Sequence, residues 1–199
     1  MFGFHGVVVT SVVIENGRTT GHNTDWWGFA ESFRRGLPDA GRERVVQLGA
    51  GGAGTAVAHA ALKLGVGRLA LFDVEPQRAG QVAARLNARF GEGRAVAGGD
   101  LAAALAQADG LIHATPTGMA KFPGLPLPAN LLHARLWVAE IVYFPLETEL
   151  LRVARRLGCR TLDGGGMAVF QAVEAFRLFT GIAPDADRML RHFASMANA

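Results

Sequence analysis

Hydrophobic and polar positions follow two different periods along this chain, and their succession predicts alternating strands and helices. Short apolar runs rich in Val, Leu and Ile predict strands, and longer segments with apolar residues every three or four positions predict helices. The predicted strands cover residues 7–17, 44–48, 68–73, 110–115, 136–143 and 159–163. The predicted helices cover residues 26–37, 54–64, 76–90, 100–108, 146–158, 167–181 and 185–197. Strands and helices in this order indicate βαβ units around a parallel sheet.

Local signals refine this pattern. An Asn-Gly pair at residues 16–17 predicts a turn after the first strand, and Asn23 or Thr24 is a suitable N-cap for the first helix. We therefore predict a doubly wound α/β domain with an extra N-terminal strand and helix and two closing C-terminal helices. These two helices and the one around Trp26 and Trp27 present apolar faces without other partners, so we expect them to pack together.

Composition excludes several classes of function. The chain has 199 residues, half of them apolar, which suffices for one sizeable core or one domain with an appendage. It contains no apolar run of membrane-spanning length and no signal-peptide pattern. Its net charge is +3, but the arginines are scattered among acidic residues, so nucleic-acid binding is disfavoured. Cys159 is the single cysteine, which excludes an internal disulfide and a multi-cysteine metal site; we expect a cytoplasmic protein without a metal.

The strongest candidate for chemistry is a glycine-rich turn between the strand 44–48 and the next helix. Gly49, Gly51 and Gly54 fit the pattern G-x-G-x-x-G, with Ala50, Gly52 and Ala53 between them. In such a turn the first glycine permits the tight bend, the second lets the backbone approach a pyrophosphate, and the third allows close helix packing. The helix N-terminus then offers its free N–H groups to the anion. The alternative is a glycine turn that binds nothing.

An acidic residue stands at the position expected for a dinucleotide site. Asp73 ends the second strand of the unit, 19 residues after Gly54, where an acid accepts hydrogen bonds from the adenosine ribose. A carboxylate there repels a 2′-phosphate, so NAD is favoured over NADP; Arg78 is nearby but lies inside the predicted helix. Asp73 could also cap that helix, alone or in addition.

Four further motifs, in this order along the chain, resemble the shikimate and quinate dehydrogenase family. They are GHNTDWWGF at 21–29, ATPTGM at 114–119, EIVYFPLETELL at 140–151 and LDGGGMAVFQAVEAFRLFTG at 162–181. The resemblance extends from about Val12 to the C-terminus, and Asp73 with the YFPLETELL stretch is more similar to the NAD-preferring quinate/shikimate branch. It implies hydride transfer between nicotinamide and a ring hydroxyl of shikimate or quinate.

The resemblance also assigns individual residues. Asp25 matches the Asp of the family's catalytic Lys–Asp pair, although an acid in a first helical turn also stabilises the helix by itself. Gln171 and Tyr143 match substrate-side residues; without the resemblance they would be an ordinary polar helix position and a core tyrosine. The cofactor side is assigned Ile141, Gly164 and Met167 by the resemblance, and Thr115 by its place just past a strand end. His22 and His113 are expected to be structural.

The family's N-terminal substrate domain and the Lys of the catalytic pair have no match here. Neither Lys63 nor Lys121 lies at the catalytic position, and Thr10 stands where the family has a substrate-binding Asn. We expect residues 1–20 to be a remnant of the substrate domain and residues 21–199 the NAD-binding domain, in a chain truncated or misassembled upstream. An apolar surface left by a lost domain would favour a homodimer.

Three hypotheses of function follow. The first is an NAD-dependent shikimate or quinate dehydrogenase, with little activity in the absence of the Lys. The second is a non-catalytic NAD-binding module, which the glycine turn and Asp73 support equally well. The third, a methyltransferase on the same glycine-rich fold, would leave the YFPLETELL and GGGMAVFQAVEAF motifs as coincidences.

Overall fold

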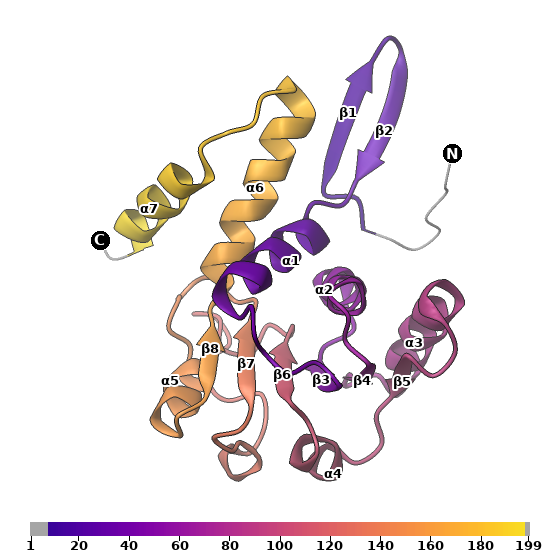
Figure 1. Ribbon diagram of the computed structural model, residues 1–199, viewed down its shortest axis with the longest axis vertical. Helices are drawn as coiled ribbons and strands as arrows, with labels where there is room; N and C mark the ends of the chain where they lie inside the picture. The colour runs from indigo at the N-terminus through magenta and orange to yellow at the C-terminus, as the bar shows by residue number, and fades with distance from the viewer. Residues whose placement is uncertain (1–7, 198–199) are drawn as a thin grey trace.

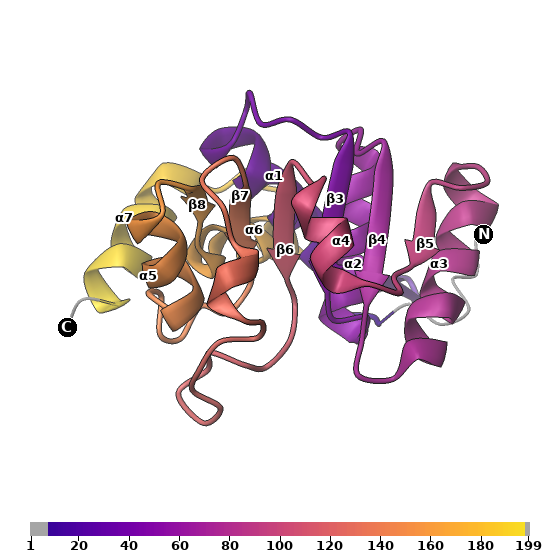
Figure 2. The same cartoon turned by 90° about the horizontal axis from the view of Figure 1, so that it is seen from below.

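A six-stranded parallel sheet forms the centre of the molecule. The computed structural model describes residues 8–197. Its strands, in the order in which they lie side by side, are β5 (Ala95–Ala97), β4 (Arg68–Phe72), β3 (Arg44–Leu48), β6 (Gly110–His113), β7 (Trp137–Glu140) and β8 (Arg160–Leu162). Figure 2 shows this order from β5 at one edge to β8 at the other. The order reverses between β3 and β6, as in doubly wound dinucleotide-binding folds, so the predicted fold class is confirmed.

Helices cover both faces of the sheet (Figure 1). They are α1 (Asp25–Gly36), α2 (Gly52–Lys63), α3 (Pro76–Phe90), α4 (Leu101–Ala106), α5 (Glu149–Arg156), α6 (Gly164–Thr180) and α7 (Ala186–Ala197), with a 3₁₀ turn at Ala129–Leu131. Successive strand residues serve opposite faces. Val45 packs in the cluster formed with α1, α2, α3 and α6, whereas Val46 packs in the cluster formed with α4 and α5.

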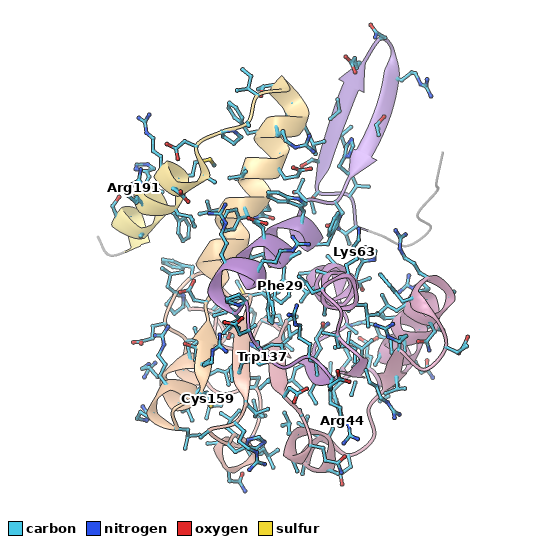
Figure 3. All side chains as sticks on the ribbon, in the orientation of Figure 1. Phe29, Arg44, Lys63, Trp137, Cys159 and Arg191 are labelled. Carbon is cyan, nitrogen blue, oxygen red and sulfur yellow. The ribbon has the colours of Figure 1, made fainter. Side chains whose placement is uncertain are left out.

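Aromatic side chains fill the space between α1 and the sheet. The rings of Phe33 and Trp137 meet edge to face with centroids 5.0 Å apart, and Phe29 lies in the same cluster (Figure 3). The indole N–H of Trp137 donates to the carbonyl of Gly41 at 2.8 Å. The large ring sits where Gly110 of the neighbouring strand has no side chain. This packing fixes α1 over the β6–β7 half of the sheet.

The two closing helices return toward α1, as expected. Trp27 packs in a third apolar cluster with α6 and with Met189, Leu190 and Phe193 of α7. Arg35 of α1 also pairs with Asp187 of α7 at 2.9 Å. Trp26, in contrast, faces α2, where its ring meets His59 edge to face. The three helices therefore form one layer beside α2.

The N-terminal segment differs from the prediction. Residues 7–17 were expected to form one strand; residue 7 lies outside the described residues, and the structure shows a hairpin of β1 (Ser11–Glu15) and β2 (Arg18–His22). Asn16 and Gly17 turn the chain with φ of 50° and 74°, the left-handed conformation that an Asn-Gly hairpin turn requires. The hairpin is tied to α1 through Thr10, whose hydroxyl accepts from the amide of Thr24 at 2.8 Å.

The strands predicted over residues 110–115 and 136–143 end earlier in the structure than the sequence pattern indicates. β6 ends at His113 and β7 at Glu140, so Thr115, Ile141 and Tyr143 all lie in loops just beyond strand ends. Among the described residues, none of the helices combines the length and hydrophobicity needed to cross a bilayer.

Candidate dinucleotide site

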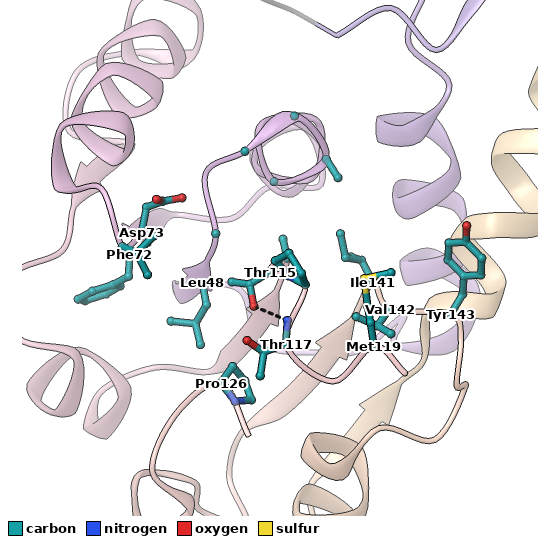
Figure 4. A pocket seen from close by; sticks show the side chains of 18 of the residues that line it. Leu48, Phe72, Asp73, Thr115, Thr117, Met119, Pro126, Ile141, Val142 and Tyr143 are labelled. Atoms are coloured by element: carbon teal, nitrogen blue, oxygen red, sulfur yellow. Dashed lines mark hydrogen bonds between the residues drawn. The ribbon is translucent and has the colours of Figure 1, made fainter. Parts of the chain in front are cut away.

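A cleft of about 1140 Å³ opens at the carboxyl ends of β3, β4, β6 and β7. This is the switch point of the sheet, where open α/β folds bind ligands. Figure 4 shows Asp73 on one side of the glycine loop and Thr115, Ile141 and Tyr143 on the other. The lining residues are Leu48, Gly49, Gly51, Gly52, Ala53, Gly54, Phe72, Asp73, Val74, Arg78, Ala114, Thr115, Pro116, Thr117, Met119, Ala120, Lys121, Pro126, Ile141, Val142, Tyr143 and Phe144.

Each glycine of the loop occupies a different environment. Gly49 has φ of 95°, and a Cβ there would lie 2.6 Å from the carbonyl carbon of Ala114. A Cβ on Gly54 would lie 2.9 Å from the carbonyl carbon of Gly49, so this glycine permits close packing of α2 on the loop. Gly51 has open space where its Cβ would stand, and it immediately precedes α2 at the cleft wall. Close contacts with neighbouring atoms explain the first and third glycines, but not Gly51.

A buried glutamine holds the loop from below. Gln47 of β3 is fully buried, and its side-chain amide donates to the carbonyls of Gly49 and Gly54, both at 2.8 Å. These bonds join the two ends of the loop across the turn. Gln47 was not predicted from the sequence, although one polar side chain among the apolar residues inside a strand indicates a buried hydrogen-bonding role.

Asp73 is bound to the same loop. One carboxylate oxygen accepts from the amide of Ala50 at 2.7 Å, and the other accepts from the amide of Glu75 at 2.9 Å. Arg78 reaches Asp73 at 3.3 Å and also pairs with Glu75. Asp73 therefore braces the glycine loop and the chain entering α3 while lining the cleft. The alternative role as a cap of α3 is not seen, because Glu75 is the N-cap residue and that end of the helix has no side-chain capping bond.

The opposite wall begins at the ends of β6 and β7. Thr115 lies two residues beyond β6, and its hydroxyl is 2.5 Å from Nε2 of the buried His113. Ile141 lies directly beyond β7, and Tyr143 follows it with half of its surface exposed. His113 is buried and hydrogen-bonded, as a structural histidine should be; His22 is half-buried in β2.

Asp25 and Gln171 lie outside the cleft lining, on the two helices that cross beside it. α1 and α6 approach so closely at Gly28 that a Cβ there would lie 2.7 Å from the amide nitrogen of Gln171 and the carbonyl oxygen of Met167. Asp25 begins α1, one turn before Gly28. The side chain of Asn23 caps this end of the helix, accepting from the amides of Asp25 and Trp26 at 3.0 and 3.2 Å.

The Asp25 carboxylate is half-buried, and desolvation by burial raises its pKa above the ordinary value. Within the described part of the chain, no hydrogen bond or ion pair reaches this carboxylate. An unpaired, partly desolvated carboxylate with a raised pKa is suited to accept a proton.

The remaining predicted positions support the site from behind. A Cβ on Gly164 would lie 2.5 Å from the carbonyl oxygen of Ile141, so α6 begins directly against the cleft wall. Met167 is buried in the core, and Ala50 is buried while its amide binds Asp73. Ten of the predicted positions line the cleft together: Gly49, Gly51, Gly52, Ala53, Gly54, Asp73, Arg78, Thr115, Ile141 and Tyr143.

Comparisons with known proteins identify relatives along almost the whole chain. The model of the shikimate 5′-dehydrogenase C-terminal domain matches residues 164–192, and that of the alanine dehydrogenase/PNT C-terminal domain matches residues 34–132. A shikimate dehydrogenase (NADP⁺) of Streptomyces avermitilis is 65% identical over 191 residues, which are 95% of this chain and 66% of the relative. The chain thus spans about two thirds of that relative's length.

A second relative, whose name specifies NAD⁺, and a solved structure also match this chain. A quinate/shikimate dehydrogenase (NAD⁺) of Corynebacterium efficiens is 50% identical over 96% of this chain and 68% of its own length. The structure of quinate dehydrogenase from Corynebacterium glutamicum in complex with NAD superposes with a TM-score of 0.89 and 47% identity, covering 92% of this chain and 66% of that one. The glycine loop, the acid at the end of β4 and these similarities agree: the chain belongs to the shikimate/quinate dehydrogenase family.

Proposed function

We propose that residues 21–199 form the dinucleotide-binding domain of an NAD-dependent dehydrogenase that acts on a ring hydroxyl of shikimate or quinate. One observation carries the proposal. Gly51 lacks a side chain where the fold would accept one, at the N-terminus of α2, and it shares a cleft with the Asp73 carboxylate. A glycine needed only for the turn would be confined by its φ or its neighbours, as Gly49 is.

The described residues fit an NAD molecule. The N-terminus of α2 and the bare backbone at Gly51 are suited to the pyrophosphate, and Asp73 is suited to the adenosine ribose. Because β4 lies on one side of β3 and β6–β7 lie on the other, the nicotinamide half belongs beside Thr115 and Ile141. Gly164 supports that wall from α6, and Met167 of the same helix belongs to the buried cluster against which Ile141 packs.

Bound NAD supplies a hydride acceptor, and the protein supplies position and proton transfer. We assign to Asp25 the proton of the substrate hydroxyl, because its carboxylate is unpaired among the described residues and has a pKa raised by burial. Gln171 and Tyr143 are proposed to bind the substrate from α6 and from the loop after β7. Residues 1–20 are proposed to end a substrate domain; of these, residues 1–7 lie outside the described residues.

Charge at the adenosine end favours NAD over NADP. The Asp73 side chain is 5% exposed and already accepts two backbone N–H groups, so it is held as an acceptor facing the cleft. Arg78 is bound to Asp73 and Glu75, which leaves its charge shared between two carboxylates. A 2′-phosphate at this point would meet two acids and a single arginine.

We also propose a cytoplasmic protein that associates as a homodimer. The use of a single, buried cysteine, Cys159, is typical of proteins from a reducing compartment. Exposed apolar side chains at Ile14, Phe179 and Ile182 provide surface for association.

A calorimetric titration with NAD and NADP, accompanied by assays of quinate and shikimate oxidation, tests the proposal. We expect NAD to bind at least about tenfold more tightly than NADP, and Asp73→Asn to narrow this ratio by removing the charge that repels the phosphate. Asp39→Asn, on an exposed turn, removes the same charge elsewhere and should change neither affinity. Binding of NADP as tight as that of NAD would refute the cofactor choice.

Turnover distinguishes the enzyme from a non-catalytic NAD-binding module. Both hypotheses predict NAD binding, but only the first predicts NADH production with quinate or shikimate. Asp25→Asn should then reduce kcat by about 10²-fold or more while leaving the affinity for NAD unchanged. NAD binding without turnover of either substrate would favour the module.

A further inference from the structure

A buried hydrogen-bond network joins the ends of β6 and β7. His113 and Glu140 are direct neighbours in the parallel register, and both side chains are fully shielded from solvent. Nδ1 of His113 donates to the Glu140 carboxylate, lying 2.9 Å from each oxygen. Because each residue is the last of its strand, the pair lies directly beneath the loops that form the cleft wall.

On the β7 side, the Glu140 carboxylate fixes the start of the following loop. It accepts from the amide of Val142 at 3.0 Å and from the hydroxyl of Thr148 at 3.2 Å. The Thr148 hydroxyl in turn accepts from the amide of Leu151 and so caps α5. One carboxylate therefore holds both ends of the loop that carries Ile141, Val142 and Tyr143 along the cleft.

On the β6 side, His113 fixes the orientation of Thr115. Nε2 of His113 lies 2.5 Å from the Thr115 hydroxyl oxygen. The same oxygen accepts from the amide of Thr117 at 3.3 Å (Figure 4). The hydroxyl cannot rotate without losing the bond to the imidazole. Thr115 lines the cleft, so a buried side chain determines how this hydroxyl meets a ligand.

Stability alone does not account for this arrangement. Burying ionisable groups carries a desolvation penalty, and apolar residues of similar volume often stabilise a core equally well or better. The preceding residues of the same two strands are apolar, and Leu111, Ile112 and Val138 are all buried. The polar network is confined to the strand ends, where it contacts the cleft wall.

We propose that His113 and Glu140 are positioning residues for the nicotinamide half of the dinucleotide, acting through Thr115 and the main chain at Val142. The inference rests on the proposed function, because that function identifies the β6–β7 side as the nicotinamide side. It adds that affinity for the nicotinamide half depends on these two buried side chains, whereas affinity for the adenosine half does not. Among residues 8–197, no side-chain hydrogen bond joins Asp73 or the glycine loop to this network.

Calorimetric titration with NAD and with ADP-ribose, which lacks the nicotinamide ring, tests this difference. We expect His113→Leu to raise the Kd for NAD by about three- to tenfold, the effect of losing one oriented hydrogen bond, and to change the Kd for ADP-ribose by less than twofold. His133→Leu is the control: His133 is partly buried and, like His113, hydrogen-bonded, but it bonds to the carbonyl of Leu105, away from the cleft. It should leave both affinities unchanged.

A second variant keeps the test valid if His113→Leu does not fold. Thr115→Val preserves shape and the buried pair, removes only the hydroxyl, and should also weaken NAD while sparing ADP-ribose. In the double variant the two effects should not add, because both act through one hydroxyl. The inference is overturned if both single variants bind NAD like the wild type, or if ADP-ribose weakens as much as NAD. If the wild type binds neither compound, the proposed function fails instead.

Discussion

Adding one methyl group at either of two glycines of the loop distinguishes a phosphate-binding loop from a turn that binds nothing. Gly49→Ala and Gly51→Ala make the same chemical change on the same loop. The structure assigns them opposite consequences, because Gly49 is confined by neighbouring backbone and Gly51 is open to the cleft.

Gly49→Ala should destabilise the fold. Its φ of 95° lies in the region that costs an L-residue about 1–2 kcal/mol. The added Cβ would also lie 2.6 Å from the carbonyl carbon of Ala114, a backbone atom that cannot rotate away, and such overpacking costs about 1–3 kcal/mol. We therefore expect the free energy of unfolding to fall by about 2–5 kcal/mol.

Gly51→Ala should leave stability nearly unchanged. The residue has φ of −71° and ψ of −163°, which alanine adopts freely. Apart from the adjacent residues of the chain, no atom of the described residues approaches within 4 Å of the new Cβ. Alanine reduces the conformational entropy of the unfolded chain, which stabilises the fold by about 0.4–1 kcal/mol. Alanine is also a poorer N-cap residue than glycine, which destabilises the fold by a similar amount. The methyl group nevertheless occupies the wall where a pyrophosphate must approach, so we expect the Kd for NAD to rise at least about tenfold.

Urea unfolding and calorimetric titration of both variants provide the assay. The expected pattern is a large loss of stability for Gly49→Ala, and a large loss of NAD affinity with retained stability for Gly51→Ala. Wild-type NAD affinity in Gly51→Ala would refute the reasoning, since the backbone at Gly51 would then not approach the ligand.

Three more predictions concern the supports of the site. Gln47→Leu leaves the carbonyls of Gly49 and Gly54 without their 2.8 Å partners, so we expect urea unfolding to show a loss of about 2–4 kcal/mol; an unchanged midpoint would contradict this. The pKa of His59 is lowered from 6.5 to about 4, chiefly by burial and then by the charges of Arg89 and Lys63. As the pH falls, the unfolded chain therefore takes up this proton at a higher pH than the folded chain does. Because the His59 ring is partly exposed and solvent screens its interactions, we expect stability to fall by about 1–2 kcal/mol as pH drops from 6.5 to 4. His59→Phe should remove this slope; an identical slope would refute the assignment. Burial raises the pKa of Asp25, so its ionised form destabilises the fold above that pKa, and Asp25→Asn should gain more stability relative to wild type at neutral pH than below 3.8. Equal differences at both pH values would show that this carboxylate is not desolvated.

Local signals were sufficient to predict most of the fold. The helix over residues 76–90 has the predicted bounds, because Pro76 marks its first turn and Gly91 follows its last residue. Two strands were missed for identifiable reasons. β2 (Arg18–His22) is almost entirely exposed and has no apolar alternation, and β5 (Ala95–Ala97) has only three residues. Their pairing depends on neighbouring strands and not on their own sequences.

Those parts of the candidate site that are marked by a spacing along the chain could be predicted from the sequence. Those that depend on how neighbouring strands align in the sheet could not. The interval between Gly54 and Asp73 indicated a shared site, but the hydrogen bond from Ala50 to Asp73 required the structure. His113 was expected to be structural, and its burial agrees. Its link to Thr115 and Glu140 depends on how β6 and β7 align, which residues 27 positions apart do not reveal in a single sequence.

The position of Asp25 follows from one helix that contacts both parts of the site. α6 begins with Gly164 against the carbonyl of Ile141 at the cleft wall, and it crosses α1 at Gly28, one turn from Asp25. Both contacts are backbone to backbone, where a single added Cβ would be too close to its neighbour. Because α6 is held this closely at two points, main-chain packing and not flexible side chains determines the distance from Asp25 to the cleft wall at Ile141. Precise placement of a proton acceptor matters because small displacements greatly reduce the rate of a transfer reaction. We therefore expect the glycines at Gly28 and Gly164 to matter for the site as much as those of the loop, although neither lines the cleft.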